Sequence, residues 1–332
     1  MFIIENYPLA VLFCFITMLC WGSWGNTQKL AAKTWRFELF YWDYVIGVLL
    51  FSLFSALTLG SFGSQGRSFI PDLMQADFSN VSSAFIGGVI FNLSNILLSA
   101  AIAISGMAVA FPLGVGLALV LGVVINYISV PKGDPVVLFV GVALITIAIL
   151  LNAKAYKNMG TNNSSATKGI IVAVVAGILM SVFYRFIAAS MDVDNFASPQ
   201  AGKMTPYTAV FIFSLGMFVS NFIINTVVMK RPFVGLPVSY KDYFNGNFKT
   251  HLIGVFGGAV WGLGNSLNLI AAGKAGAAIS YGLGQGATMV AALWGVFIWK
   301  EFKGGPKVNN TYLTMMFILF FIGIGLIIYS GS

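Results

Sequence analysis

The sequence has few charged residues, since only 8% of its 332 residues are Asp, Glu, Lys or Arg. Ordinary soluble domains carry about 25%, so a chain this poor in charge cannot cover a water-facing surface. Hydrophobic residues instead make up 58% of it. These values exclude a soluble globular protein and predict that most of the chain lies in a lipid bilayer.

Cysteine and histidine are also scarce, with two of the first and one of the second. Cys14 and Cys20 lie six residues apart in one apolar stretch, so they point to different helix faces and form neither a disulfide nor a metal pair. His251 has no Cys or carboxylate partner at metal-ligand spacing. The Gly-rich stretches lack the strand and the lysine of a phosphate loop. We therefore expect no metal, no cofactor and no enzymatic activity.

Long apolar runs are abundant, and each approaches the roughly 20 residues that a helix needs to cross a bilayer. They cover residues 8–30, 37–59, 84–104, 106–129, 135–152, 168–190, 207–229, 251–272, 276–299 and 311–330. The sequence thus predicts an all-α membrane protein of ten transmembrane helices, multi-pass in a bacterial inner or plasma membrane. The charge of +8 does not indicate a nucleic-acid partner, because Lys and Arg lie in short loops between the runs.

The loops divide into two classes by their positive charge. Thirteen Lys and Arg residues fall in or beside the loops that follow the first, fifth, seventh and ninth runs, whereas the opposite loops hold four, beside five Asp residues. Positive charge accumulates on the cytoplasmic side of membrane proteins. We therefore expect the richer loops to be cytoplasmic and both termini to be non-cytoplasmic.

The two halves of the chain resemble each other. With a constant shift of 170 residues, 87–120 align with 257–290 without a gap, and twelve of 34 positions are identical. A polar linker expected over 153–167, on the cytoplasmic side, separates five runs, in 1–152, from five others, in 168–332. Because each half has an odd number of spans, the halves are predicted to lie in opposite orientations, as in many secondary transporters.

Two charged residues fall inside apolar runs, where a charge costs about 2.5–3.5 kcal/mol on insertion scales. Asp43 has two interpretations. In the first it is functional, as a proton-coupling carboxylate or as a hydrogen-bond acceptor for the substrate. In the second it is an interfacial acid that contacts lipid headgroups or pairs with a loop lysine. Arg185 lies toward the end of the sixth run and is expected to extend its side chain to the interface.

Four amide side chains lie near the middle of their runs: Asn92, Asn95, Asn265 and Asn268. Their donors and acceptors suit a neutral, hydrogen-bonding ligand, so we interpret them as substrate-binding residues. The alternative is that they hold helices together, as Asn does in membrane bundles.

Matched helix-weakening sequences occur at 111–116 and 281–286, where the residues read FPLGVG and YGLGQG. Paired interruptions in corresponding segments indicate a transport site, which would include Tyr281 and Gln285. Close helix packing through small residues is the alternative. Trp24 in the first run could stack on a planar substrate or belong to an interfacial aromatic belt.

Several segments resemble known permeases. Residues 262–278 (GLGNSLNLIAAGKAGAA) and 292–303 (ALWGVFIWKEFK) are similar to ureide permeases and to glucose/ribose uptake proteins of the drug/metabolite transporter superfamily. Residues 206–215 and 241–244 resemble the ureide permease branch in particular. Trp24, Asp43, Asn265 and Glu301 fall on positions that look like family motifs.

The resemblance implies a ten-helix drug/metabolite transporter fold and proton-coupled transport of small polar neutral solutes such as ureides or nucleobases, by alternating access. The expected partners are the small-molecule substrate, protons and the bilayer. The alternatives are a glucose or ribose permease, a drug or metabolite exporter, and a membrane scaffold without transport.

Overall fold

The computed structural model describes residues 1–159 and 164–332. Its ten long apolar helices are each able to cross a membrane by length and composition. They are α1 (Tyr7–Ala31), α2 (Phe37–Leu57), α4 (Phe78–Ser105), η1 with α6 (Phe111–Val115 and Gly116–Ser129), α7 (Pro135–Lys157), α8 (Ser164–Ala189), α9 (Pro206–Lys230), α11 (Phe248–Ala275), α12 with α13 and η2 (Ala277–Gln285, Ala287–Leu293 and Trp294–Ile298) and α14 (Val308–Tyr329).

The ten predicted spans are confirmed, and the all-α membrane class with them. The largest difference is at α4, which begins at Phe78, six residues before the predicted start at 84. Of the predicted linker 153–167, residues 153–157 continue α7, and 160–163 lie outside the described residues. Two short helices were not predicted, α3 (Phe69–Gln75) and α10 (Tyr240–Phe244), whereas a third, α5 (Met107–Ala110), lies at the start of the predicted run 106–129.

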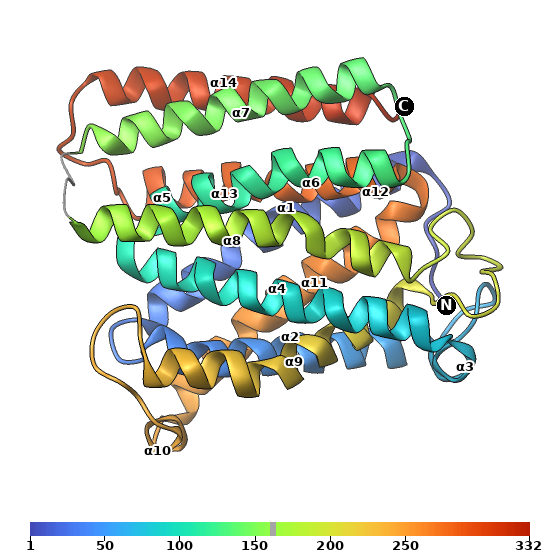
Figure 1. The fold of residues 1–332 in the computed structure, drawn as a ribbon. Helices are drawn as coiled ribbons and strands as arrows, with labels where there is room; N and C mark the ends of the chain where they lie inside the picture. Colours follow the sequence, from blue (N-terminus) through green and yellow to red (C-terminus); the bar gives the residue numbers. More distant parts are fainter. Residues whose placement is uncertain (160–163) are drawn as a thin grey trace.

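The helices lie side by side as a bundle, with both chain ends at the same end of it (Figure 1). The α7–α14 pair forms one edge and the α2–α9 pair the opposite edge, with α4, α8, α1 and α11 between them. The edge helices α7 and α14 are the most apolar and among the least buried, with only 39% and 33% of their central windows inside the protein. Those two helices therefore present most of their surface to lipid.

Packing partners are exchanged between the halves of the chain. Helix α1 packs on α11 as α8 packs on α4, and α2 packs on α11 as α9 packs on α4. Three further pairs, α2–α9, α7–α14 and α6–α12, join corresponding helices directly. This is the pattern that two related five-helix units would produce.

Glycines at the crossings follow the same exchange. A Cβ on Gly47 of α2 would collide with the backbone of Val255, and one on Gly216 of α9 would collide with the backbone of Phe85, which lies 170 residues before Val255. Such contacts are the small-residue packing by which membrane helices approach closely. The inverted relation of the halves remains a prediction, which these matched contacts support.

Two helices stop at matched glycines in a conformation that only glycine adopts readily. Gly106 ends α4 with φ 82° and Gly276 ends α11 with φ 81°. The helices that follow them, α5 and α12, start at opposite ends of the bundle (Figure 1). A similar turn of the chain is thus made once at each end.

Both predicted helix-weakening sequences coincide with irregular backbone. Residues Phe111–Val115 form a π-helical turn, and the helix of the other half is interrupted at Gly286, between α12 and α13. A second π-helical turn follows at Trp294–Ile298. Irregular backbone at membrane depth is tolerated where it is enclosed by protein or lines a cavity.

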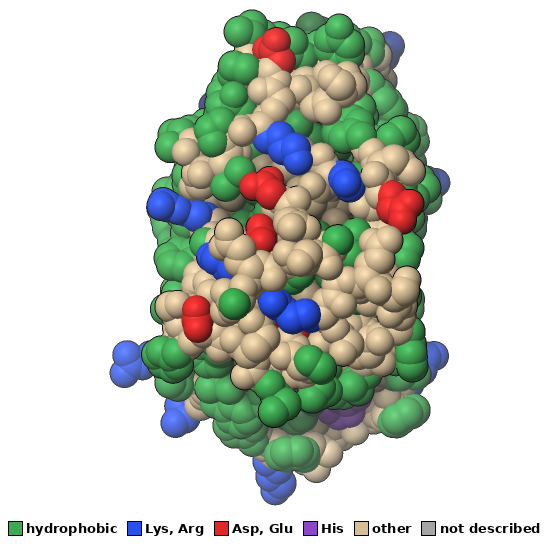
Figure 2. Space-filling view, turned by 90° about the vertical axis from the view of Figure 1, so that its right-hand side faces the viewer, with side chains coloured by type: hydrophobic (Ala, Val, Ile, Leu, Met, Phe, Trp, Pro, Cys, Tyr) green, Lys and Arg blue, Asp and Glu red, His purple; other side chains and the backbone are tan. Residues whose placement is uncertain are grey.

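The end of the bundle that carries the termini shows charges of both signs among polar atoms, with hydrophobic side chains along its flanks (Figure 2). One cluster there is built on Arg67, which pairs with the buried carboxylate of Asp72 at 2.9 Å. Arg67 also donates to the backbone carbonyls of Pro199, Gln200 and Lys203. This arginine ties the loop that contains α3 to the loop before α9.

The helix crossings yield a stability prediction. Replacing Gly258→Ala places a Cβ against the backbone carbonyl of Tyr44, so we expect the free energy of unfolding to fall by about 1–3 kcal/mol. Gly325→Ala on the exposed side of α14 meets no atom within 4 Å and is the matched control. Thermal unfolding of the detergent-purified variants measures both, and equal melting temperatures for the two would contradict close packing of α2 on α11.

Candidate functional site

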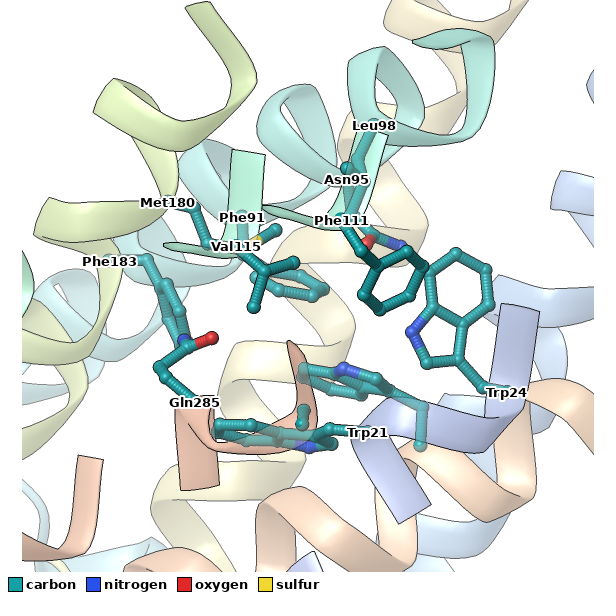
Figure 3. Close-up of a pocket in the computed structure, with 12 residues that line it drawn as sticks. Trp21, Trp24, Phe91, Asn95, Leu98, Phe111, Val115, Met180, Phe183 and Gln285 are labelled. Carbon is teal, nitrogen blue, oxygen red and sulfur yellow. The ribbon is translucent and has the colours of Figure 1, made fainter. Parts of the chain in front are cut away.

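A cavity lies in the interior of the bundle, among helices of both halves (Figure 3). The space between its walls is about 310 Å³, which includes open solvent, and the side chains leave room in it for about one water molecule in this conformation. Its lining consists of Trp21, Trp24, Phe91, Asn95, Leu98, Phe111, Val115, Met180, Phe183, Trp261, Gln285 and Ala287. Ligand sites in proteins are typically of this kind, mainly apolar with few polar groups.

Aromatic rings form most of the cavity wall. Trp261 of α11 lies between two other rings, stacked on Phe91 at 4.3 Å and on Trp21 at 5.8 Å between ring centroids. Trp24 and Phe111 pack on each other at 6.3 Å on another side of the cavity. Such faces suit a planar solute, because stacked aromatic pairs add about 0.5–1.5 kcal/mol beyond the area that they bury.

Two amides provide the polar groups of the cavity. Asn95 and Gln285 approach it from opposite sides, one from each half of the chain (Figure 3). The Asn95 Nδ2 donor has no hydrogen-bond partner among the described residues. A buried unpaired donor costs about 1–3 kcal/mol, so a ligand that accepts this hydrogen bond would be stabilised.

Three of the predicted binding residues therefore line the cavity: Trp24, Asn95 and Gln285. The structure places three others in contacts between helices. Asn92 donates to Ser220 Oγ at 3.0 Å, Asn268 to the Ser280 carbonyl at 2.8 Å, and Tyr281 to the carbonyls of Ala118 and Met180 at 3.2 and 3.1 Å. Those contacts match the alternative interpretation, in which polar side chains hold helices together.

Asn265, the repeat partner of Asn95, differs from both groups. It is fully buried, and neither its Nδ2 nor its Oδ1 has a hydrogen-bond partner among the described residues. It is absent from the cavity lining, although Trp261 lies one turn before it on α11 and lines the cavity. Its binding role stays a prediction.

The aromatic wall is what sequence reasoning missed, above all Phe91, Phe183 and Trp261. One signal could have revealed two of these residues. Phe91 and Trp261 are related by the 170-residue shift, and each lies four residues before an asparagine of the matched pair. Four residues are about one helical turn, so each aromatic ring lies on the same helix face as its asparagine.

Asp43 lies apart from the cavity lining, in a cluster near the start of α2. Its Oδ1 accepts from the Tyr243 hydroxyl at 2.7 Å and contacts His251 Nδ1 at 2.8 Å, and its Oδ2 accepts from Trp35 Nε1 at 3.1 Å. Only 1% of Asp43 is exposed. Burial, and then the neighbouring Asp43 carboxylate, raise the pKa of Tyr243, so its hydroxyl remains a donor.

The ionisable partner of Asp43 in the structure is thus a histidine, and not the loop lysine of the alternative interpretation. His251, for which the sequence suggested no role, packs edge-on against Trp35 at 5.0 Å and Tyr243 at 4.8 Å between ring centroids. Arg185 is exposed toward the end of α8, as the sequence predicted. No group of His, Cys, Asp and Glu within residues 1–159 and 164–332 could hold a metal ion.

Comparisons with known proteins concern the whole chain. A family profile described as Ureide permease matches residues 40–165 and 154–330. Ureide permease 1 of Arabidopsis thaliana is 24% identical over 100% of this chain and 99% of its own length. Ureide permease 2 of the same plant is 26% identical over 96% of each chain.

Two further matches widen the comparison. A putative sugar uptake protein of Enterococcus faecalis is 23% identical and covers 94% of this chain and 96% of its own. A crystal structure of a protein that is 13% identical superposes with a TM-score of 0.58 over 97% of this chain and 96% of the other. At that identity the likeness concerns the fold alone.

The Asp43 cluster leads to a test of how α10 is held. Tyr243→Phe removes one donor to the buried carboxylate, so we expect the free energy of unfolding to fall by about 1.5–3 kcal/mol. Limited proteolysis should also cut the segment 231–247 faster. Tyr240→Phe is the control, because that hydroxyl bonds Thr226 on the exposed surface. Equal stability and proteolysis of the two variants would contradict a structural tie through Asp43.

Proposed function

We propose that this member of the ureide permease family carries ureides or nucleobases. The family is the one that the sequence predicted, and its members are membrane transporters and not enzymes. Allantoin and uracil represent this class of small, polar, neutral solutes. The observation that supports the proposal best is the central cavity, where three tryptophans and three phenylalanines surround two amides.

The chemistry of the cavity matches that class of solute. Uracil is a flat ring, and allantoin is a nearly flat five-membered ring that carries a ureido side chain. Both present N–H donors and C=O acceptors at their edges. An amide side chain offers both a donor and an acceptor, and Asn95 and Gln285 present these groups from two sides. The lining residues carry no charge, which favours a neutral solute over an ionic one.

Sugar uptake is the second candidate, and the Enterococcus faecalis relative favours it. Sugars also pack on tryptophan faces, but they carry hydroxyl groups around the whole ring. Two of the twelve lining residues are amides, three are tryptophans with one indole N–H each, and the other seven are apolar, so most sugar hydroxyls would lose their hydrogen bonds to water without replacement. The polar groups of the cavity therefore fit a ureide better.

We propose alternating access as the mechanism, with the two halves as inverted units and the termini on the non-cytoplasmic side. Support comes from the exchanged helix partners and from the matched glycine turns at opposite ends of the bundle. Rocking of one unit against the other around a fixed central site would expose it first to one side and then to the other.

We further propose that Asp43 couples transport to protons, together with His251. Asp43 is a buried carboxylate in contact with an imidazole, and such a pair can hold a proton and pass it on. The cluster also joins α2, the α10 loop and α11. A proton on Asp43 would weaken these hydrogen bonds and so change how the three segments pack.

The solute proposal is tested by uptake into proteoliposomes with labelled allantoin, competed by unlabelled uracil, glucose and ribose. We expect uracil to compete and the sugars not to. Asn95→Leu and Gln285→Leu should each lower uptake about 5- to 150-fold, as the loss of one buried hydrogen bond of about 1–3 kcal/mol implies. Ser129→Ala, which changes an exposed hydroxyl of α6, is the control. Competition by glucose but not uracil would favour sugar transport instead.

The coupling proposal is tested with Asp43→Asn, which keeps the shape of the side chain but cannot carry charge. An inward proton gradient should accelerate allantoin uptake by the parent protein and not by the variant, while exchange of allantoin at equal pH continues. Asp134→Asn is the control, since Asn caps the start of α7 as well as Asp does. Full gradient-driven uptake by Asp43→Asn would exclude Asp43 from coupling.

A further inference from the structure

A second hollow opens at the end of the bundle opposite the termini, and we name it the vestibule. It encloses about 840 Å³ of space that includes open solvent. Helices α1, α2, α4 and α5 contribute to it, together with Val234 of the loop after α9. The residues that matter here are Gln28, Ile102 and Met107 at its inner end and Lys29, Arg36 and Glu38 farther along the chain near its mouth.

The vestibule and the central cavity are one helical turn apart on three separate segments. In each case a vestibule residue is four positions from a residue of the cavity lining. The pairs are Gln28 with Trp24, Ile102 with Leu98, and Met107 with Phe111. Four residues of α-helix span about 6 Å, so a thin layer of side chains separates the two spaces.

Gly25 allows that layer to form. A Cβ at this position would lie 3.3 Å from Met107 Cε and 3.3 Å from Phe111 Cε2. Both side chains therefore pack directly on the backbone of α1 between the two hollows. Both are also long or flat and held only by apolar contacts, so they can move aside without breaking a hydrogen bond.

Charges around the vestibule neutralise one another. Lys29 pairs with Glu301 at 2.5 Å, and Arg36 pairs with Glu38 at 2.6 Å. Arg36 also donates to the backbone carbonyls of Val234 and Leu236, which fixes the loop at the mouth. The vestibule, like the cavity, is therefore suited to a neutral solute.

Gln28 provides an unused acceptor at the inner end of the vestibule. Its Nε2 donates to the Ser99 carbonyl at 3.1 Å, which fixes the amide, but its Oε1 has no hydrogen-bond partner among the described residues. Gln28 is only 4% exposed. The buried Oε1 has lost its hydrogen bonds to water and has gained none from the protein, which costs free energy. An N–H group of a solute would supply the missing hydrogen bond.

We propose that the vestibule is a second binding site for the transported solute, in which Gln28 Oε1 accepts a hydrogen bond from an N–H group of a solute that Met107 and Phe111 separate from the central cavity. The proposal rests on the proposed function for the class of solute. The vestibule would bind a neutral molecule with an N–H group independently of the central cavity.

Protection of a cysteine in the vestibule tests this proposal. Ala103→Cys is exposed in the vestibule and reacts with a charged methanethiosulfonate in a chain that also carries Cys14→Ser and Cys20→Ala. We expect allantoin to slow the reaction several-fold. The protection should persist when Asn95→Leu and Gln285→Leu disable the central site. It should disappear with Gln28→Met, which keeps the side-chain length, and remain with Gln200→Met on an exposed loop.

Two results would overturn the vestibule site while leaving the proposed function intact. One is uptake of allantoin by the parent together with protection that vanishes when the central site is disabled. The other is protection that survives Gln28→Met. A parent protein that neither transports allantoin nor is protected by it would refute both the solute and the site.

Discussion

The contact of helix backbones at glycines is the constraint on which this structure depends. Lipid tails are as apolar as the side chains that they touch, so burial of apolar surface does not by itself drive membrane helices together. Close packing has to supply the attraction. Gly88 of α4 approaches the backbone of Phe213, and Gly258 of α11 approaches that of Tyr44. These crossings fix α4 and α11, the two helices that carry Asn95 and Trp261 into the cavity.

The helices themselves could be predicted from sequence because the bilayer imposes a length and an apolar composition on each span. Even the irregular backbone was predicted in place, at Phe111–Val115 and around Gly286, since matched Pro and Gly residues weaken both segments. The short helices α3 and α10 escaped prediction because they lie outside the apolar runs. In those segments, local hydrogen bonds at the helix ends determine the backbone conformation. At the start of α10 these are the reciprocal hydrogen bonds of Ser239 and Asp242.

The site could be predicted only where polarity marked it. Asn95 and Gln285 stood out within apolar runs, but Phe91 and Phe183 did not, because a phenylalanine that lines a cavity reads like one that faces lipid. The Asp43 cluster was hidden for another reason. Asp43 and His251 are 208 residues apart in the chain and meet only through the packing of α2 on α11. No local pattern records a contact of that kind.

The aromatic wall has a spectroscopic consequence. Three of the seven tryptophans, Trp21, Trp24 and Trp261, line the central cavity. The emission of an indole ring shifts with the polarity around it and is quenched by flat molecules stacked on its face. We therefore expect the intrinsic fluorescence of the protein to change if an unlabelled molecule binds beside these rings.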